Sequence, residues 1–257
     1  MTARIWLIGG TQESAQLARM VAGHQIPSVV SVTTEAARSL YPSLPSVQVR
    51  VGALDGDQIS HLIQREGIGA ILDASHPYAT EISTLAIAAA KAHNLPYLRY
   101  ERPPVKAAST VEVDSVETIL SDDYLNGKRV LLTVGYRLLE RFAPWQDRAT
   151  LFARILPSQV ALEAALAAGF TPDRLIALRP PLSTTLEKAL WQHWQISLVV
   201  AKASGVAGGE LVKQQVAQSL DVTLVTIRRP RVAYPHQTSR LDEAIAFCDR
   251  YSTPVAI

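Results

Sequence analysis

Apolar runs of strand length alternate with helix-period segments along almost the whole chain, and this alternation constrains the fold more than any other feature. The expected strands form two successive series, residues 4–8, 28–33, 47–51, 70–73 and 97–100, then residues 129–134, 150–155, 174–178, 197–201 and 222–227. The expected helices carry apolar residues every three or four positions, at residues 14–22, 56–65, 79–93, 158–168, 183–193, 209–220 and 240–250. Each crossover must return over a face of the sheet and bury its apolar stripe there, so the alternation predicts an α/β fold with mostly parallel sheets.

Two such series in a chain of 257 residues predict two doubly wound domains. We expect an N-terminal domain at residues 1–110 and a C-terminal domain at residues 111–257, with a cleft between them. The Pro103-Pro104 step and the polar stretch up to Asn126-Gly127 are typical of a connection. The sequence leaves open how the last helix, residues 240–250, is shared between the two domains.

Composition excludes several classes of protein. The formal net charge of +2 is small and argues against bulk binding of nucleic acid, which needs a strong basic surface. Cys248 is the single cysteine, which excludes an internal disulfide and a cysteine-rich metal site, so we expect a cytoplasmic protein without a metal. No apolar run approaches the roughly 20 residues of a membrane span.

The first predicted strand runs into Gly9-Gly10-Thr11 and then a helix. This arrangement is typical of a dinucleotide cradle, because glycines let backbone N–H groups approach a diphosphate and the helix dipole points at the same place. The usual G-x-G-x-x-G spacing is absent, and a similar turn opens α/β domains that bind no nucleotide. Glu13 complements the dipole of this helix or accepts a hydrogen bond from a hydroxyl of the ligand.

The end of the second predicted strand favours NADPH over NADH. No acidic residue closes that strand; Thr33 and Thr34 end it and Arg38 follows. Hydroxyls and a guanidinium suit a 2′-phosphate, which a carboxylate would repel. Glu35 disagrees with this interpretation unless it faces away, and Arg38 as a solvated surface residue is the alternative.

The loop after the fourth predicted strand carries Asp73, Ser75, His76 and Tyr78. In open α/β sheets ligands bind beyond the carboxyl ends of the strands, so we expect this loop beside the glycine turn. Pro77 suits the first position of a helix, with Ser75 or His76 as its cap. The alternative is that Asp73 and Ser75 only satisfy local backbone groups and that His76 is a capping residue.

Two strand exits in the second half are also candidates. Gly135 and Arg137 follow the strand at residues 129–134, and Arg137 in a first helical turn indicates either a bound anion or a surface salt bridge. Lys202, Ser204 and Gly205 begin a loop with three glycines, and Lys213 lies one turn into the next helix. This pattern resembles a phosphate or carboxylate cradle, but the Walker spacing is absent and ATP is not indicated.

With these residues in view, the chain resembles the precorrin-6A reductase family of cobalamin biosynthesis, including its cobalt-precorrin-6A branch. The resemblance runs nearly end to end and lies in the order and spacing of several short motifs. They are Gly9-Gly10-Thr11 with Glu13, Asp73-Ala74-Ser75-His76-Pro77-Tyr78-Ala79, Glu101-Arg102-Pro103, Thr133-Val134-Gly135-Tyr136-Arg137 with Phe142, Lys202-Ala203-Ser204-Gly205, and Arg229-Pro230. The chain departs from the family pattern at Ser75, where Thr is commoner, at Tyr78, where Phe is commoner, and in the turn at residues 51–56.

The resemblance implies two Rossmann-like domains and an NADPH-dependent reductase that saturates one carbon–carbon double bond of a corrin precursor. The residues expected to bind the cofactor are Gly9, Gly10, Thr11, Glu13, Thr33, Arg38, Asp73, Ser75 and His76. For an anionic tetrapyrrole, whose acetate and propionate arms need cations, they are Arg102, Gly135, Arg137, Lys202, Ser204, Gly205 and Lys213. Arg99 and Arg154 lie near the same predicted strand ends. Lys202 is the first candidate for proton donor, with His76 and Tyr78 as rivals.

Two other classes of protein share features with this sequence. A short-chain dehydrogenase needs Tyr-x-x-x-Lys on a helix, and Tyr124 to Lys128 has that spacing, but Asn126-Gly127 inside it predicts a turn. A non-catalytic protein that senses NADPH or binds a tetrapyrrole would share the cradle and the basic residues. The sequence leaves open whether the substrate holds cobalt and whether the chain is a monomer or a homodimer.

Overall fold

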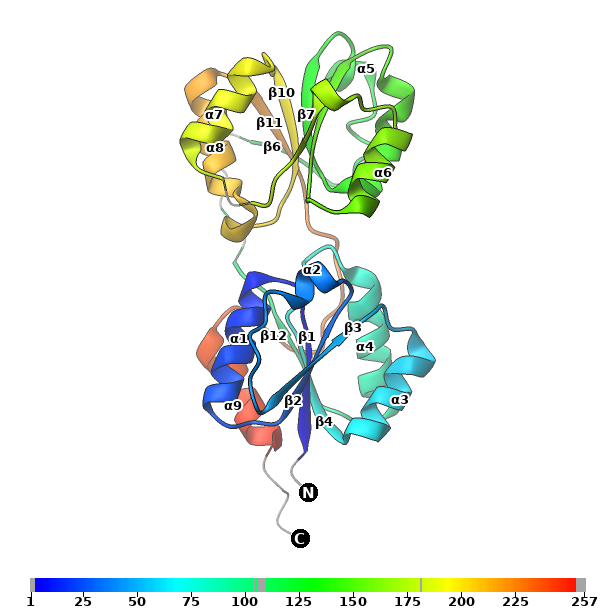
Figure 1. Cartoon of the computed structure of the whole chain (residues 1–257), viewed down its shortest axis with the longest axis vertical. Helices are drawn as coiled ribbons and strands as arrows, with labels where there is room; N and C mark the ends of the chain where they lie inside the picture. Colours follow the sequence, from blue (N-terminus) through cyan, green and yellow to red (C-terminus); the bar gives the residue numbers. More distant parts are fainter. Residues whose placement is uncertain (1–2, 104, 106–109, 181, 253–257) are drawn as a thin grey trace. The chain divides into compact units, whose positions relative to one another are not determined.

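The computed structural model describes residues 3–103, 105, 110–180 and 182–252. It divides into two compact units, the first made of Met1–Pro103 with Pro230–Ile257 and the second of Pro104–Arg229 (Figure 1). In the described part of the chain, no helix combines the length and the apolar character needed to cross a membrane.

The first unit is built on a parallel sheet of six strands in the order β12-β5-β4-β1-β2-β3. Its strands are β1 (Arg4–Ile8), β2 (Ser28–Val32), β3 (Val47–Val51), β4 (Ile68–Asp73), β5 (Tyr97–Tyr100) and β12 (Gln237–Thr238). Its helices are α1 (Gln12–Gly23), α2 (Glu35–Arg38), α3 (Gly56–Glu66), α4 (Thr80–Ala92) and α9 (Leu241–Ser252). The pair α1 and α9 covers one face of the sheet and the pair α3 and α4 covers the other (Figure 1).

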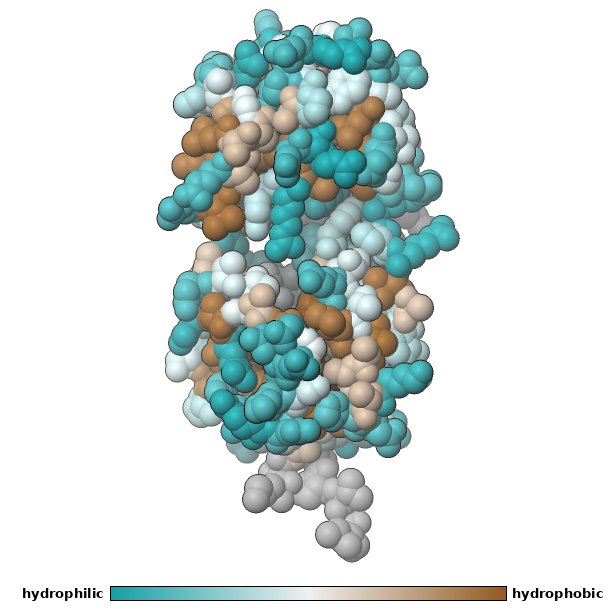
Figure 2. Space-filling view, turned by 90° about the vertical axis from the view of Figure 1, so that its right-hand side faces the viewer, coloured by the Kyte–Doolittle hydropathy of each residue, from teal (hydrophilic) through white to brown (hydrophobic). Residues whose placement is uncertain are grey.

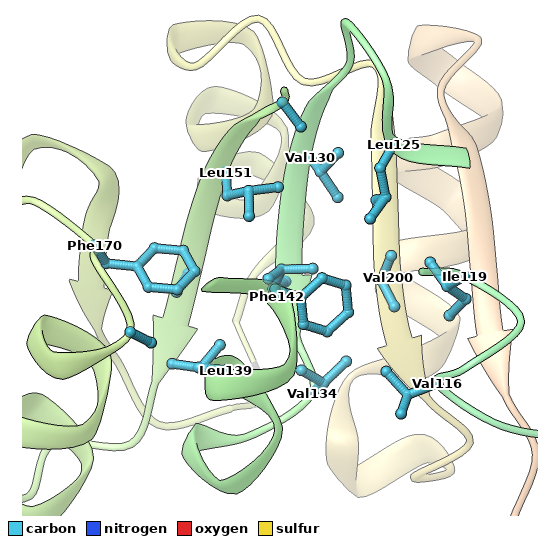
Figure 3. Packing of buried hydrophobic residues seen from close by; sticks show 14 of the residues in the cluster. Val116, Ile119, Leu125, Val130, Val134, Leu139, Phe142, Leu151, Phe170 and Val200 are labelled. Atoms are coloured by element: carbon cyan, nitrogen blue, oxygen red, sulfur yellow. The ribbon is translucent and has the colours of Figure 1, made fainter. Parts of the chain in front are cut away.

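The second unit repeats this plan with the order β6-β11-β10-β7-β8-β9, again all parallel. Its strands are β6 (Val111–Val113), β7 (Arg129–Thr133), β8 (Thr150–Ile155), β9 (Leu175–Ala177), β10 (Leu198–Lys202) and β11 (Thr223–Ile227). Its α-helices are α5 (Asp122–Leu125), α6 (Gln159–Ala167), α7 (Thr184–His193) and α8 (Glu210–Leu220), and its 3₁₀ segments are η1 (Tyr136–Trp145), η2 (Pro172–Arg174) and η3 (Val206–Gly208). Leu139 and Phe142 of η1 point toward β7, β8 and β10 in its core (Figure 3).

The central strands of both sheets are buried on both faces, as continuous apolar runs in parallel sheets require. All residues of β2 are buried, and so are the last four residues of β1. Trp6 of β1 is fully buried, and its indole N–H donates to Ser31 Oγ at 2.9 Å. On the face shown in Figure 2, hydrophobic residues form small patches separated by hydrophilic ones in each unit.

The predicted α/β class with two parallel sheets is confirmed, and all ten predicted strands are present. The edge strands β6 and β12 were missed because three and two residues are too few for a periodic pattern. The segment expected to connect the domains contains β6 and α5; its residues 104 and 106–109 lie outside the described residues.

The C-terminal segment joins the first unit, whereas we had predicted it in a second domain at residues 111–257. β12 pairs with β5, with Gln237 opposite Arg99, and α9 packs against β1, β4, β5 and α1. Ala244, Ile245 and Cys248 of α9 are buried in this contact. The reason is that α1 leaves part of one face of the first sheet open, and the apolar side of α9 covers it.

Candidate functional site

Each sheet has one point at which the strand order reverses, between β1 and β4 in the first unit and between β7 and β10 in the second. Ligands of open α/β sheets bind outside the carboxyl ends of the strands at such points. In the first unit the two loops touch there: Ala74 N–H donates to the Ile8 carbonyl at 3.0 Å, and Thr11 Oγ1 donates to the Ala74 carbonyl at 3.1 Å. The glycine turn and the loop at residues 73–78 are therefore neighbours, as predicted.

The N–H groups of the two glycines after β1 are bound within the protein. Gly9 N–H donates to the Ser31 carbonyl at 2.9 Å, and Gly10 N–H donates to the Tyr41 hydroxyl at 2.8 Å. The predicted approach of these two N–H groups to a diphosphate differs from the structure, in which both already have acceptors within the protein. Tyr41 was missed, because nothing in the sequence pattern around it indicates a contact 31 residues away.

The first turn of α1 offers the donors instead. Thr11 and Ser14 form a capping box, in which the Ser14 N–H donates to Thr11 Oγ1 and the Thr11 N–H donates to Ser14 Oγ. Helix geometry leaves the N–H groups of Gln12 and Glu13 without an intrahelical acceptor, and no other acceptor for them occurs in the described part of the chain. Gly10 has φ of 102°, and a Cβ there would meet nothing within 4 Å, so the space over this turn is open. Open N–H groups at a helix N-terminus are the kind of donors that bind anions in other proteins.

A pocket lies beside this turn in the first unit. It is lined by Thr11, Glu13, Ala74, Ser75, Pro77, Arg99, Tyr100, Glu101 and Arg102. Arg102 forms an ion pair with Glu13, and both side chains are largely buried. The structure thus brings together Thr11, Glu13, Ser75 and Arg102 from three predicted motifs.

Asp73 is fully buried and its carboxylate is directed into the protein. It accepts hydrogen bonds from Ser75 N–H at 3.0 Å, from the hydroxyls of Ser83 and Tyr97 at 2.6 Å each, and from Arg99 Nη1 at 2.9 Å. Burial, and then the Asp73 carboxylate, raise the pKa of Tyr97 far above its ordinary value. Four donors leave Asp73 little capacity for a ligand, so it acts on the site by fixing the loop that follows β4.

Arg99 is fully buried as well, which differs from the expectation that it lies with cations facing substrate carboxylates. Its Nε donates to Glu101 at 3.0 Å, its guanidinium lies 5.2 Å from the centre of the Tyr234 ring, and its Nη1 pairs with Asp73. One sequence signal could have shown this: Arg99 and Glu101 are two positions apart at the end of a buried strand, where charges need partners.

The helix expected at residues 79–93 is present, but Pro77 is not its first residue and neither Ser75 nor His76 is its N-cap residue. α4 begins at Thr80 after Ala79, with no side-chain cap, and Pro77 lies before it in a turn. Tyr78 N–H donates to His76 Nδ1 at 3.3 Å, and the two rings are 5.8 Å apart. His76 is exposed and Tyr78 is half-buried.

Thr33 and Arg38 follow β2, the neighbour of β1 in the sheet, and both are exposed. Thr34 caps the short helix α2, its Oγ1 accepting from Ala37 N–H at 3.1 Å, and Arg38 ends that helix. Neither Thr33 nor Arg38 lines the pocket described above.

In the second unit the switch point brings Gly135, Arg137 and Lys202 together. β10 pairs with β7, and a Cβ on Gly135 would lie 3.9 Å from Lys202 Nζ. Burial and then the charge of Arg137 lower the pKa of Lys202 to about 8. An amine with this pKa exchanges a proton near neutral pH, which an ordinary lysine does not.

The glycine-rich loop after β10 is filled by the protein's own side chains. Gly205 N–H donates to a Glu210 carboxylate oxygen at 2.7 Å, and Lys213 Nζ donates to the Gly208 carbonyl at 2.8 Å. Lys213 is only 3% exposed, and burial and then Arg154 lower its pKa to about 8. Gly205 and Lys213 therefore contact other protein groups, whereas we had expected them to bind substrate. Ser204 stays half-buried beside them.

Arg154 is likewise engaged within the second unit. It forms a buried ion pair with Glu187, which also accepts from the indole N–H of Trp191 at 3.2 Å. Of the cations expected near strand ends in this unit, the described structure leaves Arg137 exposed and Lys202 half-buried, and it buries Arg154 and Lys213.

Comparison with known proteins agrees with this architecture. The model of a family described as "Precorrin-6x reductase CbiJ/CobK" matches residues 4–249. A cobalt-precorrin-6A reductase of Synechocystis sp. is 49% identical over 253 residues, which cover 97% of each chain. A cobalt-precorrin-6A reductase of Priestia megaterium is 31% identical, covering 94% of this chain and 96% of its own. The solved structure of a CobK precorrin-6A reductase, 25% identical, superposes with a TM-score of 0.79 over 98% of both chains.

Proposed function

Since this chain belongs to the precorrin-6x reductase family CbiJ/CobK, we propose that it uses NADPH to saturate one carbon–carbon double bond of precorrin-6A or its cobalt form. The product is precorrin-6B or its cobalt form. The observation that carries the proposal is the open N-terminus of α1 beside a pocket that also holds Arg102.

The residues at the switch point of the first unit suit a dinucleotide phosphate. The N–H groups of Gln12 and Glu13 and the open space over Gly10 fit a diphosphate, and the exposed Thr33 and Arg38 fit a 2′-phosphate. The cofactor, when bound, supplies a hydride. The protein groups at this point therefore bind and orient the cofactor, and Ser75 and Pro77 form part of the wall of the pocket beside them.

The residues at the switch point of the second unit suit the carboxylate arms of a tetrapyrrole. Arg137 offers an exposed guanidinium and Lys202 an amine, and Gly135 beside Lys202 has no side chain to obstruct a ligand. The buried Arg154 pairs with Glu187 and the buried Lys213 donates to the Gly208 carbonyl, so we assign neither a role in binding.

Reduction also requires one proton, and Lys202 combines a pKa that suits its delivery with partial exposure, whereas Lys213 with a similar pKa is buried. With a pKa of about 8, most Lys202 side chains carry a proton at pH 7 and release it readily. His76 and Tyr78 are the alternative donors in the first unit. We further propose a cytoplasmic protein, because the lone Cys248 is buried and free.

A spectroscopic assay tests the proposal directly. The protein is mixed with NADPH and either precorrin-6A or its cobalt form, and absorbance is followed in the band of reduced nicotinamide. A steady decrease that depends on the tetrapyrrole supports a reductase. Binding of both molecules without loss of absorbance would instead support a sensor. A decrease that occurs with NADH and the tetrapyrrole but not with NADPH and the tetrapyrrole would reject NADPH as the cofactor.

A further inference from the structure

Tyr41 lies directly under the glycine turn, although it is 31 residues away in the sequence. Its side chain packs in the core of the first unit and is only 7% exposed. Its hydroxyl accepts from Gly10 N–H at 2.8 Å and lies 2.6 Å from Ser14 Oγ. Burial raises the pKa of this hydroxyl, so it stays protonated and keeps a proton to donate.

The hydrogen bonds around this hydroxyl form a directed chain. Ser14 Oγ donates to the Thr11 carbonyl at 2.8 Å, which leaves Ser14 Oγ as the acceptor for the Tyr41 proton. Gly10 N–H then donates to Tyr41, Tyr41 to Ser14, and Ser14 to Thr11. Hydrogen bonds in such a chain strengthen one another. These hydrogen bonds hold the glycine turn and the first residues of α1 together.

Tyr41 also explains why residue 9 is a glycine. A Cβ at position 9 would lie 2.3 Å from the Tyr41 hydroxyl oxygen and 3.0 Å from Val30 Cγ1. The aromatic ring therefore occupies the space that a side chain on Gly9 would take. The absence of a Cβ there serves contact with the tyrosine, and the open face of the turn is at Gly10.

The other end of Tyr41 holds the segment that carries Arg38. Tyr41 N–H donates to the Arg38 carbonyl at 3.0 Å, just after the helix that Thr34 caps. One residue thus bonds to the turn that fits a diphosphate and to the segment that fits a 2′-phosphate.

We propose that Tyr41 is a positioning residue that fixes the distance between these two phosphate sites and so contributes to the preference for NADPH over NADH. The inference rests on the proposed function for the identity of the cofactor. A diphosphate and a 2′-phosphate of one molecule have a limited range of separations, so sites held at a fixed separation bind both with less loss of entropy. Tyr41 touches neither phosphate and acts through Gly10 and Arg38.

The Tyr41→Phe variant tests this role, because it keeps the ring and removes the hydroxyl. We expect the Kd for NADPH, from fluorescence titration, to rise about fivefold, which corresponds to one net hydrogen bond. The Kd for NADH should rise less, and kcat should change less than twofold. Tyr251→Phe is the matched control, since Tyr251 lies on α9 of the same unit, far along the chain from the turn, and both Kd values should stay unchanged. Equal losses for the two cofactors, or no loss, would overturn the proposal.

A second measurement needs no cofactor. Gly9→Ala in the wild-type chain should lower the urea midpoint, because its methyl group meets the Tyr41 oxygen. In a Tyr41→Phe chain the same change should cost less, since the oxygen is gone and the nearest ring carbon is 3.1 Å away. Additive effects in this double-mutant cycle would overturn the role of Tyr41 even if NADPH binds. Absence of NADPH binding to the wild type, with a coupled cycle, would instead reject the cofactor on which the inference rests.

Discussion

Both units contain a glycine-rich loop between a buried strand and a helix, and the two loops are used in opposite ways. After β1, the capping box and Tyr41 hold the turn from below, and the N–H groups at the start of α1 remain open. After β10, Glu210 at the start of α8 turns back and accepts the Gly205 N–H, and Lys213 donates to the Gly208 carbonyl. The first loop leaves helix N–H groups open, and in the second loop the protein's own Glu210 carboxylate accepts from a backbone N–H.

This difference shows that glycines and a helix N-terminus do not make an anion site by themselves. What decides is whether a carboxylate of the protein occupies the donors. Glu13 and Glu210 both lie in the first turn of a helix, but Glu13 pairs with Arg102 outside the turn and Glu210 binds within its own loop. A first-turn acid with a cation nearby is therefore compatible with a ligand site.

The largest expected effect comes from replacing one glycine of each loop by valine and comparing the two variants. Gly10→Val and Gly209→Val both place a side chain at positive φ, 102° and 74°, so each costs about 1–3 kcal/mol of stability. Gly10→Val also fills the space over the open turn, and its affinity for NADPH should fall at least about 100-fold, or ~3 kcal/mol. Gly209→Val should bind NADPH like the wild type.

Fluorescence titration gives both affinities, and circular dichroism verifies that each variant is folded. Loss of NADPH binding in the Gly209 variant would mean that the loop after β10 holds the cofactor, and the contrast between the loops would fail.

The next effect concerns Lys202 at the switch point of the second unit. Lys202→Met should lower kcat about 100-fold and change the Kd for NADPH little, because the lost group delivers a proton. In the wild type, kcat should decline as pH rises through about 8, since the ammonium form is the donor and is lost above its pKa. Single-turnover rates between pH 6 and pH 9.5 measure both. A Lys202→Met variant with an unchanged rate and an unchanged alkaline decline would leave His76 or Tyr78 as the donor.

Most of the fold was predictable, because apolar periodicity is a local signal. The ten expected strands were all found, and the place of the loop after β4 beside the glycine turn followed from the rule on parallel strand ends. β12 carries no comparable signal, since its place beside β5 depends on a chain that returns from the second unit.

The sequence could not predict which polar side chains near the site bind other protein groups and which face a ligand. Whether Asp73, Arg99 or Lys213 faces a ligand or the protein depends on contacts between residues distant in the sequence, such as Arg99 with Tyr234. Sequence spacing places a residue near the site, and burial then decides its role.

A smaller effect tests the segment after β2. Arg38→Ala should raise the KM for NADPH about tenfold, the loss of one charge-assisted contact, and leave the KM for NADH unchanged. Steady-state kinetics with both cofactors give the ratio, and Arg19→Ala on α1 is a control that also removes one arginine from the first unit. Equal losses with NADPH and NADH would show that Arg38 supports the fold of this segment only.

The smallest expected effect comes from removing the charge of Glu210, which binds the loop after β10. Glu210→Gln keeps an acceptor for Gly205 N–H and removes the negative charge, so stability at pH 7 should fall by about 1 kcal/mol with NADPH affinity unchanged. Glu210 raises the pKa of Lys213, and its removal should lower that pKa below its value of about 8. The unfolded chain then binds more protons than the folded chain from below pH 8 up to the ordinary lysine pKa, so stability should rise with pH over a wider range than in the wild type. Urea unfolding at pH 7, 8 and 9 measures this slope. A variant that gains affinity for inorganic phosphate or NADPH would instead show that the carboxylate was keeping a ligand site closed.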